Sequence, residues 1–478
     1  MTSETITDVV GRIRKEFADI HDSMNWLSPE AAATASETRA ALTDAIGTFP
    51  VARWSASKTK LHTHGLSPGC ELCRQGTWSC LFVNGICNAH CFYCPSAQND
   101  SGPPMANSVV FDKPRDYADF VNLFQIKGVS FSGGEPFLTF KRVLAFLQTL
   151  KSQVDYPLYT WIYTNGLQVT RDRLVALRDN GLDEIRFDLS ANAYRLDGLE
   201  KAVGIIPRVT IEIPAIPEDA STLEALMPVW ERAGVDHLNL HQIRCTPFNS
   251  RRLAKRGYTF VYGPQVTVLE SELTALRLIR HALSNSIDLP INYCAYAYRR
   301  QFQGAGARRR YASSVKASYE DITPTGHIRH LELLGSVLSI ASIYQALASH
   351  GVDSTLYSLS KNGERLSFCA ALWPFIDFSR VRLKIKYSAA VLRPMVSYHH
   401  AFKEIPLNNS KTIVIENQTA MSGVWLDGEE IQVYGRMIQS QEKVALHWES
   451  EMEEFCVLKE LLPFETFVEG LSIYYLYN

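Results

Sequence analysis

Three cysteines lie close together in the stretch GICNAHCFYCPS, residues 85–96: Cys87, Cys91 and Cys94. Thiolates are strong ligands for zinc and for iron–sulfur clusters, but the usual all-cysteine shell for either contains four of them. Three cysteines therefore indicate either a fourth protein ligand from elsewhere in the chain or one metal position that is left open. An open position is what chemistry at a metal requires.

Polar residues also follow the next predicted strands along the chain, in the stretches SGGEP (132–136), YTNG and DLSA. The glycines of the first stretch let backbone groups approach a ligand closely, and the glutamate adds a carboxylate. We expect all of these residues to converge with the cysteines at one edge of a sheet. They are Gly133, Gly134, Glu135, Thr164, Asn165, Asp188 and Ser190.

The elements that must position these residues are strands and helices in alternation. Six short segments rich in β-branched and aromatic residues are predicted as strands, and helical patterns separate them. This order indicates an α/β fold with a parallel sheet, either open or rolled into a barrel, whose chemistry lies at the C-terminal ends of the strands. The predicted strands are 78–85, 128–134, 158–166, 184–191, 208–216 and 236–243.

The motif CNAHCFYC has the form C-x3-C-x-aromatic-C, and GGEP follows one strand–helix unit later. This combination resembles the radical S-adenosylmethionine (SAM) superfamily over roughly residues 76–243. The longer stretch GCELCRQGTWSCLFVNGICNAHCFYCP is similar to a little-characterised group related to pyruvate formate-lyase activating enzymes. The resemblance implies a partial (β/α)6 barrel and an enzyme that cleaves SAM reductively to a 5′-deoxyadenosyl radical, which takes a hydrogen atom from a substrate.

The resemblance also implies roles for the residues that match its motifs. Cys87, Cys91 and Cys94 would hold three irons of a [4Fe–4S] cluster, and SAM would chelate the fourth. Gly133, Gly134 and Glu135 would bind the SAM amino group, and Tyr93 would lie near the adenine. The ribose or methionine would contact Thr164, Asn165, Asp188 and Ser190. The alternative interpretation of the three cysteines is a structural zinc site or a group of buried free thiols, neither of which requires GGEP.

A second set of cysteines precedes the first strand. Cys70 and Cys73 form a C-x2-C pair, a common spacing of metal ligands, and Cys80 follows. With Cys294, or alternatively Cys245, they could hold an auxiliary iron–sulfur cluster or a zinc ion. Equally, they could be partly buried free thiols.

Arginines concentrate in RRLAKR (251–256) and RRQFQGAGARRR (299–310). They could bind an anionic substrate through guanidinium forks, but a solvated, salt-bridged surface is the favoured interpretation. His241, at the end of the sixth predicted strand, could contact a substrate or make a structural hydrogen bond.

Bulk properties limit the cell compartment and the partners. The 478 residues carry 48 Lys and Arg against 50 Asp and Glu, so no overall positive charge favours a nucleic-acid partner. No signal peptide or membrane span is predicted, and ten cysteines in a cytoplasmic protein favour metal binding over disulfides. We expect three parts: an N-terminal helical segment (1–55), a radical SAM partial barrel (56–250) and a C-terminal α+β domain that closes the barrel (251–478).

Three functions remain open from the sequence. A radical SAM enzyme acting on a small, polar or anionic molecule is favoured, because no peptide-recognition module is visible. Radical SAM modification of a peptide or protein, including activation of a glycyl-radical enzyme, is the second. A non-catalytic iron–sulfur or zinc protein is the third. For either enzyme we expect a flavodoxin- or ferredoxin-type reductant.

Overall fold

The computed structural model describes residues 6–440 and 455–471, and the chain divides into two compact units. Of the described residues, the barrel unit comprises 6–300 with Leu407–Lys411 and 470–471. The C-terminal unit comprises Gln301–Pro406, 412–440 and 455–469. None of the described helices combines the length and apolar character that crossing a bilayer demands.

The barrel unit is built on a sheet whose seven central strands run parallel to their neighbours. Across the sheet these are β15 (Ile291–Cys294), β12 (His237–His241), β11 (Arg208–Pro214), β10 (Glu184–Phe187), β9 (Tyr159–Thr164), β8 (Gly128–Gly133) and β4 (Trp78–Ile86). Antiparallel β3 (Lys60–Thr63) and β2 (Ala52–Ser55) continue the sheet beyond β15. The α/β fold and its partial parallel barrel are therefore confirmed, and all six predicted strands are present.

One strand extends the sheet beyond the sequence prediction. β15 lies after residue 250, yet it pairs in parallel with β12, from Leu238 with Ile291 to His241 with Cys294. The compact unit accordingly continues to Arg300, past the boundary predicted at 250. The described part of the N-terminal segment also belongs to this unit, since α2 (Pro29–Gly47) carries Arg39, whose Nε donates to Glu272 of α10 (Leu269–Ser284) at 2.5 Å.

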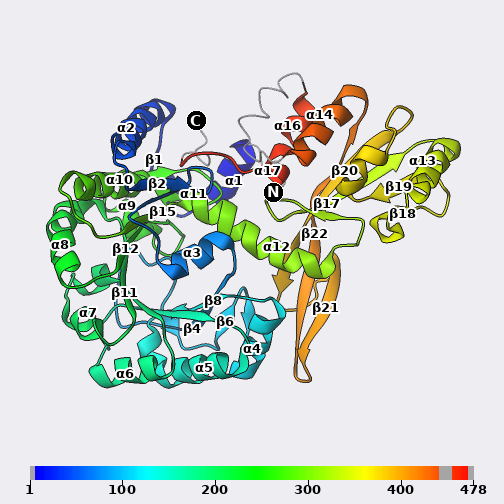
Figure 1. The fold of residues 1–478 in the computed structure, drawn as a ribbon. Helices are drawn as coiled ribbons and strands as arrows, with labels where there is room; N and C mark the ends of the chain where they lie inside the picture. The colour runs from blue at the N-terminus through cyan, green and yellow to red at the C-terminus, as the bar shows by residue number, and fades with distance from the viewer. Residues whose placement is uncertain (1–5, 441–454, 472–478) are drawn as a thin grey trace. The chain divides into compact units, whose positions relative to one another are not determined.

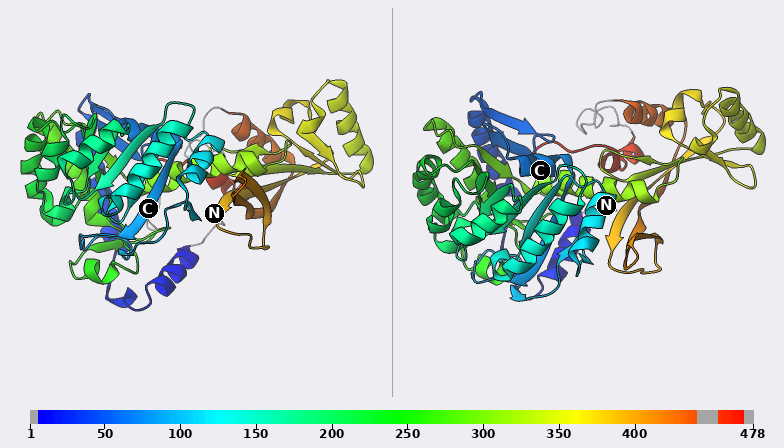
Figure 2. Two further views of the ribbon diagram at one scale, coloured as in Figure 1. Left: turned by 90° about the horizontal axis from the view of Figure 1, so that it is seen from below. Right: turned by 60° about the horizontal axis from the view of Figure 1, so that its bottom comes forward.

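Helices cover the outer face of the curved sheet (Figures 1 and 2). They pack on strand positions that are fully buried, such as Phe131, Ile162, Ile185 and Ile211. These helices are α4 (Pro114–Leu123), α5 (Phe140–Gln153), α6 (Arg171–Asp179), α7 (Asp197–Ala202), α8 (Ala220–Arg232) and α10 (Leu269–Ser284). The short helix α3 (Pro68–Gln75) lies inside the ring of strands in Figure 1, where a Cβ at Gly69 would stand 2.4 Å from Arg186.

The remaining elements of the barrel unit are short apart from α1 and α2. Two helices lie near the N-terminus, α1 (Ile6–Glu16) and α2 (Pro29–Gly47). A separate small sheet contains β1 (Asn25–Trp26), β13 (Thr259–Val261) and β14 (Thr267–Val268). α9 (Ser250–Ala254) follows β12, and α11 (Tyr296–Tyr298) follows β15. Small β-elements after the cysteine loop are β5 (Asn99–Asp100), β6 (Met105–Ala106) and β7 (Val109–Val110).

The C-terminal unit is α+β, with a seven-stranded sheet whose recorded pairings are antiparallel. Its strands are β16 (Asp321–Ile322), β17 (Ile328–Leu334), β18 (Tyr357–Leu359), β19 (Arg365–Phe368), β20 (Arg382–Arg393), β21 (Ala401–Asn408) and β22 (Lys411–Leu426). Its described helices are α12 (Gly304–Val315), α13 (Val337–Ser349), α14 (Gly428–Gln439), α16 (Cys456–Lys459) and α17 (Leu462–Glu465). Its core surrounds a buried ion pair, Arg329 with Glu465 at 2.8 Å.

Candidate active site

The three clustered cysteines form a loop at the C-terminal end of β4. Cys87 directly follows the strand, and the loop closes on itself where the Cys94 N–H donates to the Cys91 carbonyl at 3.3 Å. The Cys87 sulfur accepts from the Ala89 N–H at 3.4 Å and from Asn165 Nδ2 at 3.7 Å. All three thiols are half-buried, so they remain accessible to a ligand.

Two side chains from the segment after β12 donate hydrogen bonds to carbonyl groups of the cysteine loop and so hold the loop in place. Arg252 donates from Nη1 to the Cys91 carbonyl at 3.0 Å and from Nη2 to the Cys94 carbonyl at 3.4 Å. Asn249, which is fully buried, donates to the Tyr93 carbonyl at 2.9 Å. Sequence reasoning missed this contact, because it took RRLAKR as an anion site or a solvated surface. Nothing in the spacing of these residues indicates that they meet a loop more than 150 positions upstream.

The protein environment favours the protonated thiol at two of the three cysteines. Burial raises the pKa of Cys91 to about 12, and the Asp188 carboxylate adds to that effect. Burial also raises the pKa of Cys87. Thiolates therefore need a positive partner here, which a metal cluster supplies when it displaces the protons.

The GGEP stretch packs directly against the end of the cysteine-bearing strand. A Cβ at Gly134 would lie 1.9 Å from the Ile86 carbonyl oxygen, and one at Gly133 would lie 2.2 Å from that of Asn84. Any side chain would therefore push the two strand ends apart. The glycines permit this close approach, and the Glu135 N–H then donates to the Ile86 carbonyl at 2.7 Å.

Glu135 is almost fully buried, and its carboxylate joins two strand ends. It accepts from the Asn165 N–H at 2.7 Å, from the Thr164 hydroxyl at 2.9 Å and from the Phe137 N–H at 3.0 Å. Burial nevertheless raises the pKa of Glu135 to about 7. The carboxyl group therefore stands close to its protonation midpoint at neutral pH, and a nearby cation would favour its ionised form.

Tyr93, Asp188 and Ser190 form a second polar group at the end of β10. The Tyr93 hydroxyl donates to Asp188 at 2.8 Å and lies 2.5 Å from the Ser190 hydroxyl. Burial raises the pKa of Asp188 to about 6. The residues predicted to share one edge of the sheet are thus brought together there, and their contacts with a ligand stay predictions.

The second set of cysteines is divided. Asn292 Nδ2 donates to the Cys70 sulfur at 3.6 Å, and the Tyr298 hydroxyl donates to the Cys73 sulfur at 3.8 Å. Burial raises the pKa of Tyr298, and the charges of thiolates at Cys73, Cys294 and Cys70 act in the same direction. Cys80 instead faces Ser130 and Ser132 of the neighbouring strand.

Cys245, the alternative fourth ligand, is buried in an apolar cluster with Tyr258 and Phe260. In the described ranges 6–440 and 455–471, no group of three His, Cys, Asp or Glu side chains converges closely enough to hold a single metal ion. This holds for Cys87, Cys91 and Cys94 as well as for the second set.

Arginines gather at the same end of the sheet, beyond β12 and β15. Burial raises the pKa of Tyr296, and the positive charges of four guanidinium groups oppose that rise. They belong to Arg300, Arg244, Arg299 and Arg12. His241 ends β12 nearby, and burial, followed by the charge of Arg299, lowers its pKa to about 4, so the imidazole is neutral at pH 7.

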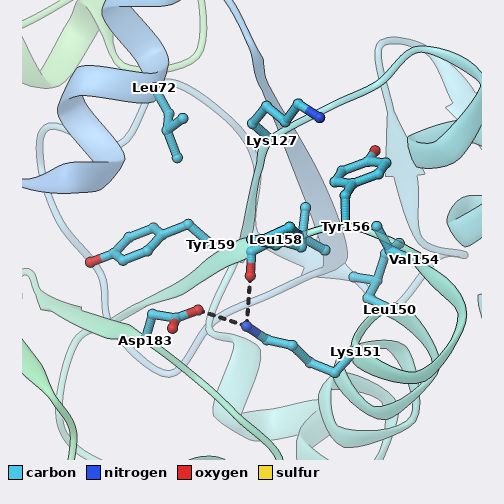
Figure 3. Close-up of a pocket in the computed structure, with 10 residues that line it drawn as sticks. Leu72, Lys127, Leu150, Lys151, Val154, Tyr156, Leu158, Tyr159 and Asp183 are labelled. Atoms are coloured by element: carbon cyan, nitrogen blue, oxygen red, sulfur yellow. Dashed lines mark hydrogen bonds and ion pairs between the residues drawn. The ribbon is translucent and has the colours of Figure 1, made fainter.

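A pocket at the opposite end of the strands is not part of this site (Figure 3). Its lining includes Lys127, Tyr159 and Asp183, which stand at the N-terminal ends of β8, β9 and β10. Lys151 donates to the Leu158 carbonyl at 2.7 Å and to Asp183 at 2.8 Å, which leaves it engaged in the fold.

Comparisons with known proteins agree with this geometry. Residues 81–229 match the family model described as the Radical SAM superfamily. Two curated relatives carry the name "Putative glycyl-radical enzyme activating enzyme". The one from Methanocaldococcus jannaschii is 29% identical over 273 residues, which cover 55% of this chain and 72% of the relative. The one from Haemophilus influenzae is 25% identical over 181 residues, which cover 35% of this chain and 65% of the relative, just under two thirds.

Among solved structures, methylornithine synthase aligns at 11% identity over 56% of this chain and 82% of its own, with a TM-score of 0.32. The hydrogenase maturase HydG aligns at 10% identity over 48% of this chain and 57% of its own, with a TM-score of 0.29. Both scores are low, so the fold rests on the strand order described above.

The chain therefore carries a radical SAM domain and is a radical SAM enzyme. Its cofactors are a [4Fe–4S] cluster and S-adenosylmethionine. The donor set fits them: one loop at the C-terminal edge of the sheet presents three accessible thiols and no fourth, beside a buried carboxyl group.

Proposed function

We propose that this edge of the sheet is the catalytic centre, with Cys87, Cys91 and Cys94 as the cluster ligands. The bound cofactors would supply a 5′-deoxyadenosyl radical, made by reductive cleavage of SAM, that removes hydrogen from a substrate. Gly133, Gly134 and Glu135 serve the SAM amino group.

The remaining predicted residues belong to two hydrogen-bonded groups, one around Glu135 and one around Asp188. Asp188 and Ser190, which hydrogen-bond with Tyr93, serve the ribose or the methionine, and Tyr93 lies near the adenine. Thr164 and Asn165 hold Glu135 in place from the neighbouring strand. The hydrogen bonds that join these residues at successive strand ends support this assignment.

We further propose that the substrate is a small molecule with a negatively charged group, such as a carboxylate or a phosphate. The observation that carries this proposal is the gathering of four guanidinium groups around Tyr296, at the same end of the parallel strands as the cysteine loop. Several positive charges that act on one point favour the binding of an anion there. Arg244 is exposed, so such a ligand can reach it from solvent.

The test uses reconstituted full-length protein, dithionite and SAM, with panels of small carboxylates, phosphates and matched neutral compounds. An anionic substrate should raise the rate of 5′-deoxyadenosine formation and, when deuterated, should transfer deuterium into the product. Arg244→Ala should raise the substrate KM about tenfold and leave SAM cleavage without substrate unchanged. Stimulation by neutral compounds alone would contradict the proposed substrate class.

A second candidate function is activation of a glycyl-radical protein, which the names of the two curated relatives favour. The same reaction mixture, with a glycyl-radical protein in place of the small molecules, tests it. A glycyl radical detected by electron paramagnetic resonance, with one 5′-deoxyadenosine formed for each radical, would support this second function. In either case a flavodoxin or a ferredoxin is the reductant we propose, and dithionite stands in for it.

A further inference from the structure

Two cysteines of the barrel unit lie on one side of a short helix inside the ring of strands. Cys70 and Cys73 are three positions apart in α3, and residues at that spacing are neighbours on a helix surface. Ser67 caps the helix by accepting from the Cys70 N–H at 3.2 Å. The close packing of Gly69 against Arg186 and Trp161 holds the helix in place.

The end of β15 presents a third thiol to the same side of this helix. Asn292 donates to the Cys70 sulfur at 3.6 Å, and Cys294 lies two positions further along the strand. Residues two apart on a strand share a face and stand about 7 Å apart. Four positions later, the Tyr298 hydroxyl donates to the Cys73 sulfur at 3.8 Å. The segment 292–298 therefore borders both helix thiols and contributes Cys294 beside them.

Cationic side chains lie beside these three thiols, and the carboxylates of Glu184 and Glu212 also act on Cys70. Arg299 donates from Nε to the Cys294 sulfur at 3.4 Å. Lys60 pairs with Cys294 in the sheet register, is 1% exposed, and places Nζ 4.2 Å from the centre of the Tyr298 ring. In the part of the chain that the structure describes, neither cation forms a salt bridge with a carboxylate. Buried cations without a directly paired carboxylate are costly, and thiolates or an anionic cluster would supply negative charge beside them.

We propose that Cys70, Cys73 and Cys294 hold a second iron–sulfur cluster, distinct from the one at the Cys87 loop. Binding would convert each thiol to a thiolate with release of its proton, and one iron would lack a cysteine ligand. A structural zinc site closes its shell with four ligands, and Cys80, the other member of the predicted set, faces Ser130 and Ser132 instead. Among the described residues, these three thiols do not converge closely enough to bind a single metal ion. The same is true of the thiols of the Cys87 loop, where the cofactor is a cluster.

The test counts iron, sulfide and zinc per chain in full-length protein after anaerobic reconstitution. Wild type should contain about eight irons, as expected for two [4Fe–4S] clusters. Cys73→Ala and Cys294→Ala should each lose about four, whereas the matched control Cys80→Ala should keep all of them. Equal iron in wild type and in both variants would overturn the proposal.

A complementary variant covers the case in which loss of a second-site thiol disturbs folding. In Cys87→Ala/Cys91→Ala/Cys94→Ala every second-site residue is intact, so about four irons and an iron–sulfur absorption spectrum should remain. A chain without iron in this variant, or one zinc ion in place of the second cluster, would overturn the assignment. The proposal does not depend on the substrate. Failure of SAM cleavage in a protein with eight irons would count against the proposed function alone.

Discussion

The two cysteine sets of the barrel unit differ in how the chain assembles them. Cys87, Cys91 and Cys94 lie in one loop, and their half-buried sulfurs have contacts within that loop and with Asn165. Cys70 and Cys294 come from a helix and from a strand end more than 200 positions later, and side-chain donors contact their sulfurs. A site formed by one loop can be identified from spacing, whereas a site formed across the fold needs the fold itself.

The surroundings of the two sets also differ in charge. Carboxyl groups lie near the loop, where Asp188 adds to the burial that raises the pKa of Cys91. Lysine and arginine side chains lie near the second set. The loop therefore depends on its metal for charge compensation, while the second set lies beside buried cations as well as the Glu184 and Glu212 carboxylates. This difference can be tested by variants that disturb one set and spare the other.

The largest effect is expected from Cys91→Ala. This variant removes one of the three loop thiols, so 5′-deoxyadenosine formation from SAM should fall to the level of a blank without protein. The second set should still retain iron, which separates loss of one site from loss of the fold. Substantial 5′-deoxyadenosine formation by Cys91→Ala would contradict the assignment of the loop.

Arg252→Ala should act on the loop alone, because Arg252 donates to the carbonyls of Cys91 and Cys94. Outer contacts of this kind usually change metal affinity or activity by about 10–100-fold. We expect a loss in that range, together with a changed electron paramagnetic resonance spectrum of the loop cluster. Arg251→Ala is the matched control, since Arg251 only approaches Asp19, at 3.7 Å on the surface. Equal losses of activity in both variants would argue against a specific role for the hydrogen bonds from Arg252 to the loop.

Glu135→Ala should destabilise the barrel unit. It leaves the N–H groups of Phe137 and Asn165 without their buried acceptor, at about 1–3 kcal/mol each. Denaturant unfolding should show a loss of about 2–6 kcal/mol in the free energy of unfolding. Glu135→Gln retains one acceptor oxygen and should lose less. A neutral result for Glu135→Ala would mean that this link between β8 and β9 contributes little.

The pH dependence of stability should carry a contribution from the same residue. Burial raises the pKa of Glu135 from its usual 4.5 to about 7, so between these values the folded state binds more protons than the unfolded state. The contribution is fully present below about pH 4.5 and is lost as pH rises towards 7, by about 3 kcal/mol in all. Glu135→Gln should flatten the profile in this window. An unchanged slope would contradict the raised pKa.

The smallest effect is expected from Tyr93→Phe. It removes the hydroxyl that donates to Asp188, and the loss of one such buried hydrogen bond costs about 1–3 kcal/mol. SAM affinity should fall by about tenfold or less, as measured by equilibrium dialysis, with the iron content unchanged. Phe92→Leu, in which the neighbouring aromatic ring is replaced, serves as the comparison. A larger effect on iron than on SAM would place Tyr93 with the cluster.

Most of the parallel sheet could be predicted from the sequence, because its strands alternate with amphipathic helices and end in recognisable polar motifs. β15 could not, since its four residues follow a break in that alternation and are recognised only by their pairing with β12. The Cys87 loop could be predicted because its ligands are adjacent in sequence. Two features depend on tertiary contacts that no local pattern encodes. One is the set of hydrogen bonds from Asn249 and Arg252 to the cysteine loop, and the other is the separation of Cys80 from Cys70 and Cys73.

The measurement that tests the central claim most directly is 5′-deoxyadenosine formation by anaerobically reconstituted, dithionite-reduced protein supplied with SAM. The Cys91→Ala variant, prepared in parallel, is the reference. We expect product from wild type and none above background from the variant, because only the intact loop can hold the cluster that reduces SAM. Equal product from both would show that the three-cysteine loop is not the catalytic centre.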